Sequence, residues 1–395
     1  MKFLRTTVAV AALAAALGSA NAAYAARAYI GTYTPDPADA RSGGGNHGEG
    51  IYLVNIDDAT GAPSNPKLVA KSLSPTWITL SADHKFLYAI NEIASYGANK
   101  SGSITAYAVD QASGALKQLN VVDSGGSIPC YVSVHPSGKF LLVANYTGGS
   151  YSVTRIKADG SLGETSDVVK PGGPMSVYNA ADRPKGMFPT MEPHGSRGHM
   201  ILPDPSGQYV LGADAGRDQI FVWKLDTSSG KLQEVSVTKS LAGAAPRHFA
   251  FSPDGKTLYQ QQEQDSRLTV YGFAGGKLTA KGASISTLPA GFEGSNTTSE
   301  LLIDKAGKHL YGANRNHDSI ATMAITADSA KLVANTHTEG TIPRSLTLDP
   351  SGKFLYSLNQ NASNVTTFAI GANGVPKFTG KFMGLGSPAV MVFLP

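Results

Sequence analysis

Short apolar runs in this chain alternate with tight-turn signals in an order that repeats along its length. In one copy, Phe249 and Phe251 alternate with Ala250 and Ser252, which is the period of a β-strand. The Pro-Asp-Gly-Lys sequence at 253–256 favours a tight turn, because proline presets φ and glycine accepts positive φ. Further strands are expected from Leu258, at 268–273 and from Lys277. One copy therefore predicts four antiparallel strands.

Six copies of this pattern align without a gap. Their first strands begin near Thr76, Cys130, His199, Arg247, Ser299 and Arg344. A spacing of roughly 40–55 residues between strand-rich units is typical of a propeller. A seventh unit is split: residues 29–33 and 50–55 supply its second and third strands, and 388–393 its innermost strand.

Pairing the C-terminal strand into the N-terminal blade would close the ring and remove the exposed sheet edges. The sequence therefore predicts an all-β, seven-bladed β-propeller that forms a single domain over residues 26–395. A pair of β-sandwiches is the competing architecture.

The first 25 residues have the organisation of a secretory signal peptide. Lys2 and Arg5 precede an apolar stretch at 8–17, and small residues around Ala22 and Ala25 form two cleavage sites. We therefore expect residues 1–25 to be removed and the protein to be periplasmic or secreted. No other stretch is apolar for long enough to predict a membrane span.

Composition restricts the classes of partner. The chain has 33 basic and 29 acidic residues, and removal of Lys2 and Arg5 leaves 31 basic ones. This balance gives no basis for nucleic-acid binding. Cys130 is the only cysteine, so an internal disulfide is impossible, and we expect it to be buried and inert. The nine histidines show no zinc spacing, and we expect a monomer without metal or cofactor.

The repeat also predicts where a site would lie. The start of the first strand and the end of the second share one edge of an antiparallel hairpin. Since first strands line a propeller channel, one channel mouth should carry two rings of side chains. The first-strand ring comprises Thr76, Cys130, His199, Arg247, Ser299, Arg344 and Ala389. The second-strand ring comprises Glu92, Tyr146, Ala215, Glu263, Arg315 and Gln360.

The two rings differ from blade to blade, whereas the position just before the second ring is nearly uniform. That position holds Asn91, Asn145, Asp214, Gln262, Asn314 and Asn359. Uniform amides and carboxylates suit a structural role in holding the backbone of the loop that follows. The varied rings instead indicate a binding site for a small anion, with solvated loop charges as the alternative.

Each residue type in the rings has a chemical reason to be there. Arginine presents a permanently charged fork that suits carboxylate or phosphate. Glu263 lies between Arg247 and Arg315 in blade order and could act as a base or orient water. His199 could move a proton near neutral pH, and His194 could assist it. Residues 170–197, the longest non-repeating connection, are expected to form a lid or specificity loop.

The chain resembles the seven-bladed lactonase propeller family, which includes the propeller type of 6-phosphogluconolactonase and the fungal 3-carboxy-cis,cis-muconate lactonising enzyme. The resemblance covers essentially the whole chain after residue 25. It rests on the sequences at 29–34, 87–92, 141–150, 246–248, 262–263, 314–320 and 343–344. It implies a metal-independent site in the channel mouth, with catalytic His199, Arg247, Glu263 and Arg315. We expect the substrate to be bound by Arg344, His194, Glu92, Tyr146 and His248.

These features predict a hydrolase that opens the ester ring of a small, anionic, sugar-type lactone, in the manner of 6-phosphogluconolactonase. Arginines would stabilise the oxyanion, and Glu263 or His199 would take the proton of the attacking water. Three alternatives remain open at this point: a lactonising cycloisomerase of the muconate type, a non-catalytic binding propeller, and a lactonase that depends on a divalent metal.

Overall fold

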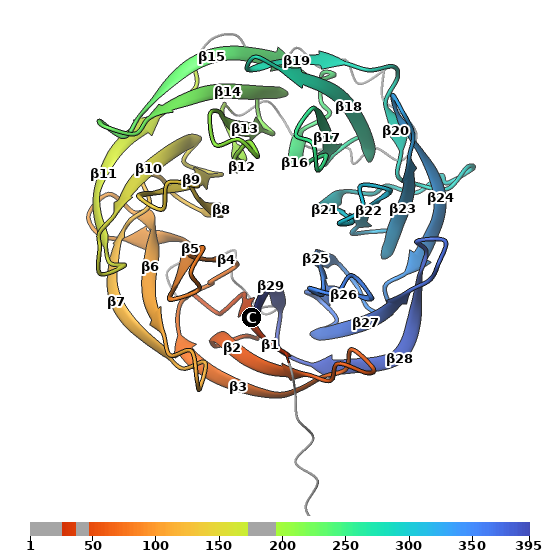
Figure 1. The fold of residues 1–395 in the computed structure, drawn as a ribbon, viewed down its shortest axis with the longest axis horizontal. Helices are drawn as coiled ribbons and strands as arrows, with labels where there is room; N and C mark the ends of the chain where they lie inside the picture. Colours follow the sequence, from red (N-terminus) through yellow and green to blue (C-terminus); the bar gives the residue numbers. More distant parts are fainter. Residues whose placement is uncertain (1–25, 37–46, 173–194) are drawn as a thin grey trace, which may run out of the picture.

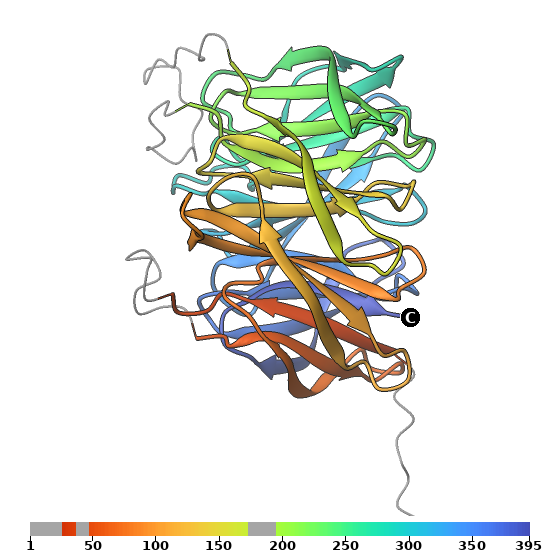
Figure 2. The same cartoon turned by 90° about the vertical axis from the view of Figure 1, so that its left-hand side faces the viewer.

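The computed structural model describes residues 26–36, 47–172 and 195–395. In these ranges every regular element is a β-strand, and the strands form seven antiparallel sheets around a central channel (Figure 1). The predicted all-β, seven-bladed propeller is confirmed. Seen from the side, the blades form a thick disc, with the C-terminus on the right-hand face (Figure 2).

Each blade has four strands that run in order from the channel outward. Blade 1 contains β29 (Pro388–Leu394), β1 (Ala26–Thr32), β2 (Gly50–Ile56) and β3 (Pro63–Lys71). Blade 2 contains β4 (Trp77–Leu80), β5 (Phe86–Tyr96), β6 (Ser101–Val109) and β7 (Leu116–Asp123). Blade 3 contains β8 (Pro129–Val134), β9 (Phe140–Asn145), β10 (Ser150–Ile156) and β11 (Leu162–Val169). Blade 4 contains β12 (Gly198–Pro203), β13 (Val210–Asp214), β14 (Gln219–Asp226) and β15 (Lys231–Lys239).

The remaining blades follow the same order. Blade 5 contains β16 (Pro246–Phe251), β17 (Thr257–Gln262), β18 (Arg267–Ala274) and β19 (Lys277–Ala280), with the short β20 (Ile285–Ser286) also paired to β18. Blade 6 contains β21 (Thr298–Ile303), β22 (His309–Asn314), β23 (Ser319–Ile325) and β24 (Ala330–His337). Blade 7 contains β25 (Pro343–Leu348), β26 (Phe354–Asn359), β27 (Asn364–Ile370) and β28 (Pro376–Gly384).

The ring closes as the sequence predicts. β29 pairs antiparallel with β1 in a register that places Tyr29 opposite Val392 and Ile30 opposite Met391. The two ends of the described chain therefore share one sheet (Figure 1).

Tyrosines of the second strands join neighbouring blades, which explains the Leu-Tyr element of the repeat. The hydroxyl of Tyr29 donates to the carbonyl of Gly114 in blade 2 at 2.9 Å. Tyr311 and Tyr356 donate to carbonyls in blades 7 and 1 in the same way, each at 2.9 Å. All three rings are fully buried, so each fills the core between blades while its polar end keeps a hydrogen-bond partner.

Candidate active site

A β-bulge displaces the first-ring residue of the inner strand in six of the seven blades described. In blade 4, Gly198 pairs with Asp214 and Met200 with Ala213, which leaves His199 out of the ladder. The same irregularity isolates Cys130, Arg247, Arg344 and Ala389, and in blade 6 the break in register leaves both Ser299 and Glu300 unpaired in the ladder. Because a bulge re-aims the extra residue, these side chains are released from the pleat of the sheet at the channel mouth.

Backbone hydrogen bonds join the two predicted rings. The N–H of Glu263 donates to the carbonyl of Ala245, two residues before Arg247, at 2.7 Å. Tyr146 and Gln360 make the equivalent bond in their own blades, at 2.8 and 3.0 Å. The structure therefore confirms that both rings lie at one edge of the blades.

This register also identifies a ring member that the sequence analysis missed. The N–H of Tyr33 donates to the carbonyl of Ser387 at 2.9 Å, so Tyr33 is the second-ring residue of the split blade. Its signal was available in the sequence, because residues 28–33 align with 87–92 and place Tyr33 at the position of Glu92.

The residue two places before each buried ring arginine adopts an unusual conformation that an aspartate holds. Ala245 and Ile342 have φ of 58° and 55°, in the left-handed region that non-glycine residues seldom adopt. The N–H of Ala245 donates to Asp218, and that of Ile342 to Asp318, each at 2.8 Å. These aspartates fix the turns that lead into Arg247 and Arg344.

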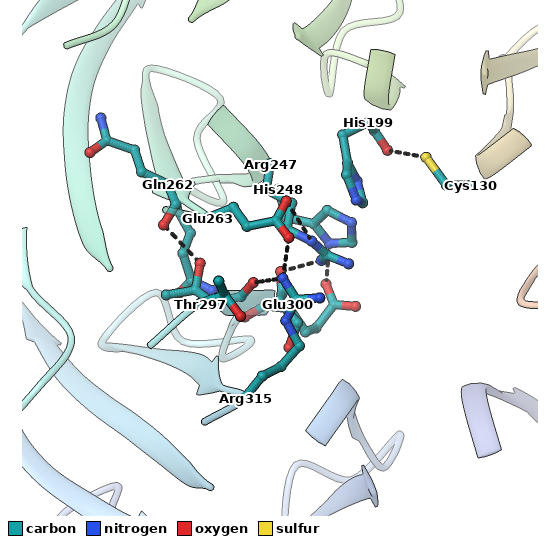
Figure 3. A network of polar contacts seen from close by, with 12 residues as sticks. Cys130, His199, Arg247, His248, Gln262, Glu263, Thr297, Glu300 and Arg315 are labelled. Atoms are coloured by element: carbon teal, nitrogen blue, oxygen red, sulfur yellow. Dashed lines mark hydrogen bonds and ion pairs between the residues drawn. The ribbon is translucent and has the colours of Figure 1, made fainter. Parts of the chain in front are cut away.

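Two arginines surround one carboxylate in what we call the Glu263 cluster: Arg247, Glu263 and Arg315 (Figure 3). Nη2 of Arg315 contacts Oε1 of Glu263 and donates to the carbonyl of Thr298 at 3.0 Å. Nη1 of Arg247 donates to the carbonyl of Ser299 at 2.5 Å. Arg247 Nε lies 3.6 Å from Glu263 Oε2, which is an ion pair but too long for a hydrogen bond.

A second cluster at the mouth, the Glu92 cluster, consists of Tyr33, Glu92 and Arg344. Arg344 donates from Nε to the Tyr33 hydroxyl at 2.9 Å, and its Nη2 lies 3.8 Å from Glu92. Tyr33 and Thr76 both donate to Glu92 Oε2, at 3.1 and 2.6 Å. Burial raises the pKa of Tyr33 above its usual value, so the phenol stays neutral and can make these bonds.

His199 lies beside these clusters with its ring against Tyr146 at a centroid distance of 5.5 Å. The guanidinium of Arg197 lies over the same Tyr146 ring, 5.1 Å from its centroid. Burial lowers the pKa of His199 well below its usual value, and positive charge nearby, on His248 when that ring is protonated and on Arg344 and Arg315, lowers it further. His199 is therefore a neutral imidazole at neutral pH.

Four residues that each follow a first-ring residue form what we call the channel floor: Trp77, Tyr131, His248 and Glu300. The His248 ring meets Trp77, Tyr131 and His199 edge-to-face at centroid distances of 5.2, 5.4 and 5.2 Å. Its Nδ1 lies 3.0 Å from Oε1 of Glu300. His248, predicted to bind substrate, is 1% exposed and forms part of this floor.

Several polar atoms of the site are buried and have no hydrogen-bond partner among the described residues. They are Nε of Arg247, Nε of Arg315, Nη1 of Arg344, Oε2 of Glu263, Nδ1 of His199 and Nε2 of His248. Buried polar groups in proteins are nearly always hydrogen-bonded, so a cluster of exceptions needs an explanation. The donors on three arginines suit the anionic or carbonyl oxygens of a ligand, and the acceptors on Glu263 and His199 suit hydroxyl groups or a water molecule.

Below the floor, the channel widens into a cavity of about 650 Å³. Apolar side chains from all seven blades line most of it, including Ile78, Met200, Phe249, Leu346 and Phe393. The charged side chains in its lining are three carboxylates, on Glu300, Asp304 and Asp349, and one amine, on Lys305, so an anion would find little compensation there for its lost hydration. The candidate site is therefore the charged mouth and not this cavity.

Comparison with known proteins supports the same assignment. Residues 27–393 match the family model described as "Lactonase, 7-bladed beta-propeller". The chain belongs to this lactonase family. A 6-phosphogluconolactonase of Bacillus subtilis is 33% identical over 321 residues, which cover 80% of this chain and 83% of that protein.

Two solved structures superpose closely on this chain. The periplasmic gluconolactonase of Pseudomonas aeruginosa has a TM-score of 0.81 at 28% identity, covering 93% of this chain and 98% of its own. A protein from Lactobacillus plantarum has a TM-score of 0.80 at 29% identity, with coverage of 94% and 99%. The predicted enzyme class, a lactonase, is thus confirmed at the level of the family.

The nearly uniform position just before the second ring has a structural role, as predicted. Nδ2 of Asn91 donates to the carbonyl of Leu73 at 2.8 Å, and Asn145, Asn314 and Asn359 hold equivalent carbonyls. Asp214 instead accepts from the N–H groups of Arg197 and Gly216. The amides thus mostly hold the connection that enters the blade, rather than the following loop that the sequence suggested.

The described residues contain no group of three or more His, Cys, Asp or Glu side chains arranged to hold a metal.

Cys130 is buried, as expected. Its Sγ lies 3.3 Å from the carbonyl of His199, and burial raises the pKa of the thiol well above its usual value. His194 and most of the predicted 170–197 loop lie outside the described residues. In the part of the chain that the structure describes, no helix is long and apolar enough to cross a membrane.

Proposed function

We propose that this protein hydrolyses a small, anionic or polyhydroxylated sugar-type lactone at the charged channel mouth, without a metal ion. The observation that carries the proposal is the set of unpartnered buried donors and acceptors on Arg247, Arg315, Arg344, Glu263 and His199. Three guanidinium groups against the carboxylates of Glu263 and Glu92 leave one positive charge, which favours an anion.

The arginines have two roles in this proposal. Nη1 of Arg344 and the Nε atoms of Arg247 and Arg315, which lack hydrogen-bond partners among the described residues, would bind the lactone carbonyl and the anionic or hydroxyl oxygens of the substrate. Their charges are held in place by the Glu263 and Glu92 clusters before the substrate arrives. Preorganised donors of this kind stabilise the oxyanion that forms when water attacks the carbonyl carbon.

Proton transfer is assigned to His199 and Glu263. The neutral imidazole of His199 has a free Nδ1, and Oε2 of Glu263 has a free lone pair. One of them takes a proton from the attacking water as the new C–O bond forms. When the tetrahedral intermediate collapses, the ring C–O bond breaks and a proton passes to the leaving alkoxide, which gives the open-chain hydroxy acid.

The relatives support this substrate class. Two of them are named for 6-phosphogluconolactone and gluconolactone, and both span most of this chain. The candidate signal peptide and the periplasmic relative together support an unphosphorylated sugar lactone outside the cytoplasm as the first substrate to examine.

A lactone panel tests the proposal. The purified protein would be assayed by pH-stat against glucono-, galactono-, phosphoglucono- and aliphatic lactones, with and without EDTA. We expect hydrolysis of a sugar lactone at a rate that EDTA leaves unchanged. Loss of activity with EDTA would contradict the metal-free mechanism. Absence of hydrolysis across the panel, or ring closure of a muconate instead, would contradict the lactone hydrolase.

A further inference from the structure

The residues that directly follow the first ring form a second layer of the channel. They are Trp77, Tyr131, Met200, His248, Glu300, Ser345 and Val390. In this layer, only His248 and Glu300, from neighbouring blades, carry an imidazole or a carboxylate; the other residues are aromatic or aliphatic, apart from the hydroxyl-bearing Ser345. Their side chains are 1% and 7% exposed.

The pair is held in one geometry. Oε1 of Glu300 lies 3.0 Å from Nδ1 of His248 and accepts from the N–H of Leu301 at 3.2 Å. Trp77 and Tyr131 enclose the imidazole, and Nε2 keeps no hydrogen-bond partner among the described residues. Apolar residues would fill such a layer without the desolvation cost of a buried ionisable pair. Folding alone therefore does not explain why His248 and Glu300 are present.

We propose that Glu300 and His248 are a positioning pair for His199. Glu300 accepts the Nδ1–H of His248 and so fixes the ring and its tautomer, with Nε2 left as an acceptor. The fixed imidazole packs against His199 at a centroid distance of 5.2 Å (Figure 3). Neither residue needs to touch the substrate, because both act through His199.

This inference rests on the proposed function and deepens it. While His199 holds the proton of the attacking water, it is a buried cation that the charges of Arg344 and Arg315 disfavour. Glu300 lies one imidazole away and supplies negative charge, and the Nε2 lone pair of His248 supplies an acceptor. The same carboxylate–imidazole arrangement orients the base in hydrolytic triads, where the carboxylate acts through the histidine.

A double substitution separates function from folding. In His248→Phe with Glu300→Leu, an aromatic ring and an aliphatic chain complete the apolar layer, and we expect a melting temperature equal to or above that of the wild type. We expect kcat to fall about 100-fold with KM nearly unchanged, because only the orientation of the acid–base group is lost. Glu300→Gln, which keeps an acceptor for Nδ1–H, should retain more activity than Glu300→Leu. A folded double variant with wild-type kcat would overturn the proposal.

The matched control is Asp304→Asn, which alters the His309–Asp304 pair of 2.8 Å in the same blade but away from the mouth; its kcat should match the wild type. Imidazole ¹⁵N NMR gives a readout that does not depend on turnover. Glu300→Leu should shift the His199 nitrogens and change the tautomer of His248. If both spectra stay at the wild-type values, the pair does not position His199, even if lactone hydrolysis is confirmed. If no lactone is hydrolysed but the spectra change, only the proposed function fails.

Discussion

Arginine and glutamate at the channel mouth are buried to an extent that these residue types seldom reach. Arg247 is 1% exposed and Arg344 6%, yet each keeps donors that nothing in the described chain accepts. Such an arrangement is costly for folding, because the charges are desolvated and only partly paired. A bound anion would complete the pairing, so this pattern at the residue scale is the strongest argument for a ligand site.

Substitution of the central carboxylate tests the residue assignments. Glu263→Gln should lower kcat/KM by about 10²–10⁴-fold, because the amide neither takes a proton nor neutralises Arg247 and Arg315. Steady-state hydrolysis of the preferred lactone measures the effect. The control is Glu164→Gln, which alters an exposed Arg155–Glu164 pair on outer strands and should leave turnover unchanged. Equal rates for Glu263→Gln and the wild type would remove Glu263 from the site.

The pH profile tests His199. The pKa of this imidazole is lowered by burial, so the neutral form needed to accept a proton persists on acidification below the usual range of histidine. We therefore expect kcat/KM to show no decline attributable to His199 between pH 8 and about 6.5, and its acid limb to lie lower. A His199→Gln variant should lack that limb and be slower at every pH. An inflection at about 6.5 that disappears in this variant would contradict the buried neutral imidazole.

At this scale, the sequence identified most of the charged mouth but not all of it. The alignment of the six repeats was enough to predict that five of its residues lie together: His199, Arg247, Glu263, Arg315 and Arg344. Tyr33 was missed because its blade is split between the two ends of the chain, so its ring position is not evident from the six intact copies of the repeat. Glu300 was missed for a different reason, since only the structure shows that it reaches Nδ1 of His248.

At the scale of elements, the decisive features are the bulge at the start of six inner strands and the strained turns before Arg247 and Arg344. Neither has a residue signature: isoleucine and alanine occupy the left-handed positions at Ile342 and Ala245, where glycine or asparagine would be expected. Strand existence and the hairpin turns could be predicted from alternation and turn residues. The bulge could not, because it depends on how the ladder resumes after an unpaired residue.

The aspartates that hold these turns give a test at this scale. Asp318→Ala removes the acceptor of the Ile342 N–H and should allow the left-handed turn to relax, which displaces Arg344. We expect KM for an anionic lactone to rise at least tenfold and stability to fall by about 1–3 kcal/mol. Asp318→Asn, which keeps an oxygen acceptor, should lose much less. Kinetics and denaturant unfolding of both variants measure this, and equal KM values would show that the turn does not position Arg344.

At the scale of the whole molecule, the site depends on ring closure, because its residues come from blades 1 to 7. The sequence predicted this closure from the spare strand at the C-terminus, and β29 fills that place. A chain that ends at residue 387 would lack β29 and expose the inner edge of β1. We expect it to lose cooperative thermal unfolding and to aggregate. A soluble truncated protein with the wild-type melting curve would contradict closure by this strand.

The central claim is hydrolysis of a lactone by water at the charged mouth, and turnover in H₂¹⁸O tests it most directly. Wild-type protein would be incubated with its preferred sugar lactone and EDTA, and the product analysed by mass spectrometry. The account predicts an open-chain acid with one ¹⁸O in its carboxylate, formed far faster than with Glu263→Gln. Formation of the acid at the same rate with and without protein, or only when the chelator is omitted, would contradict it.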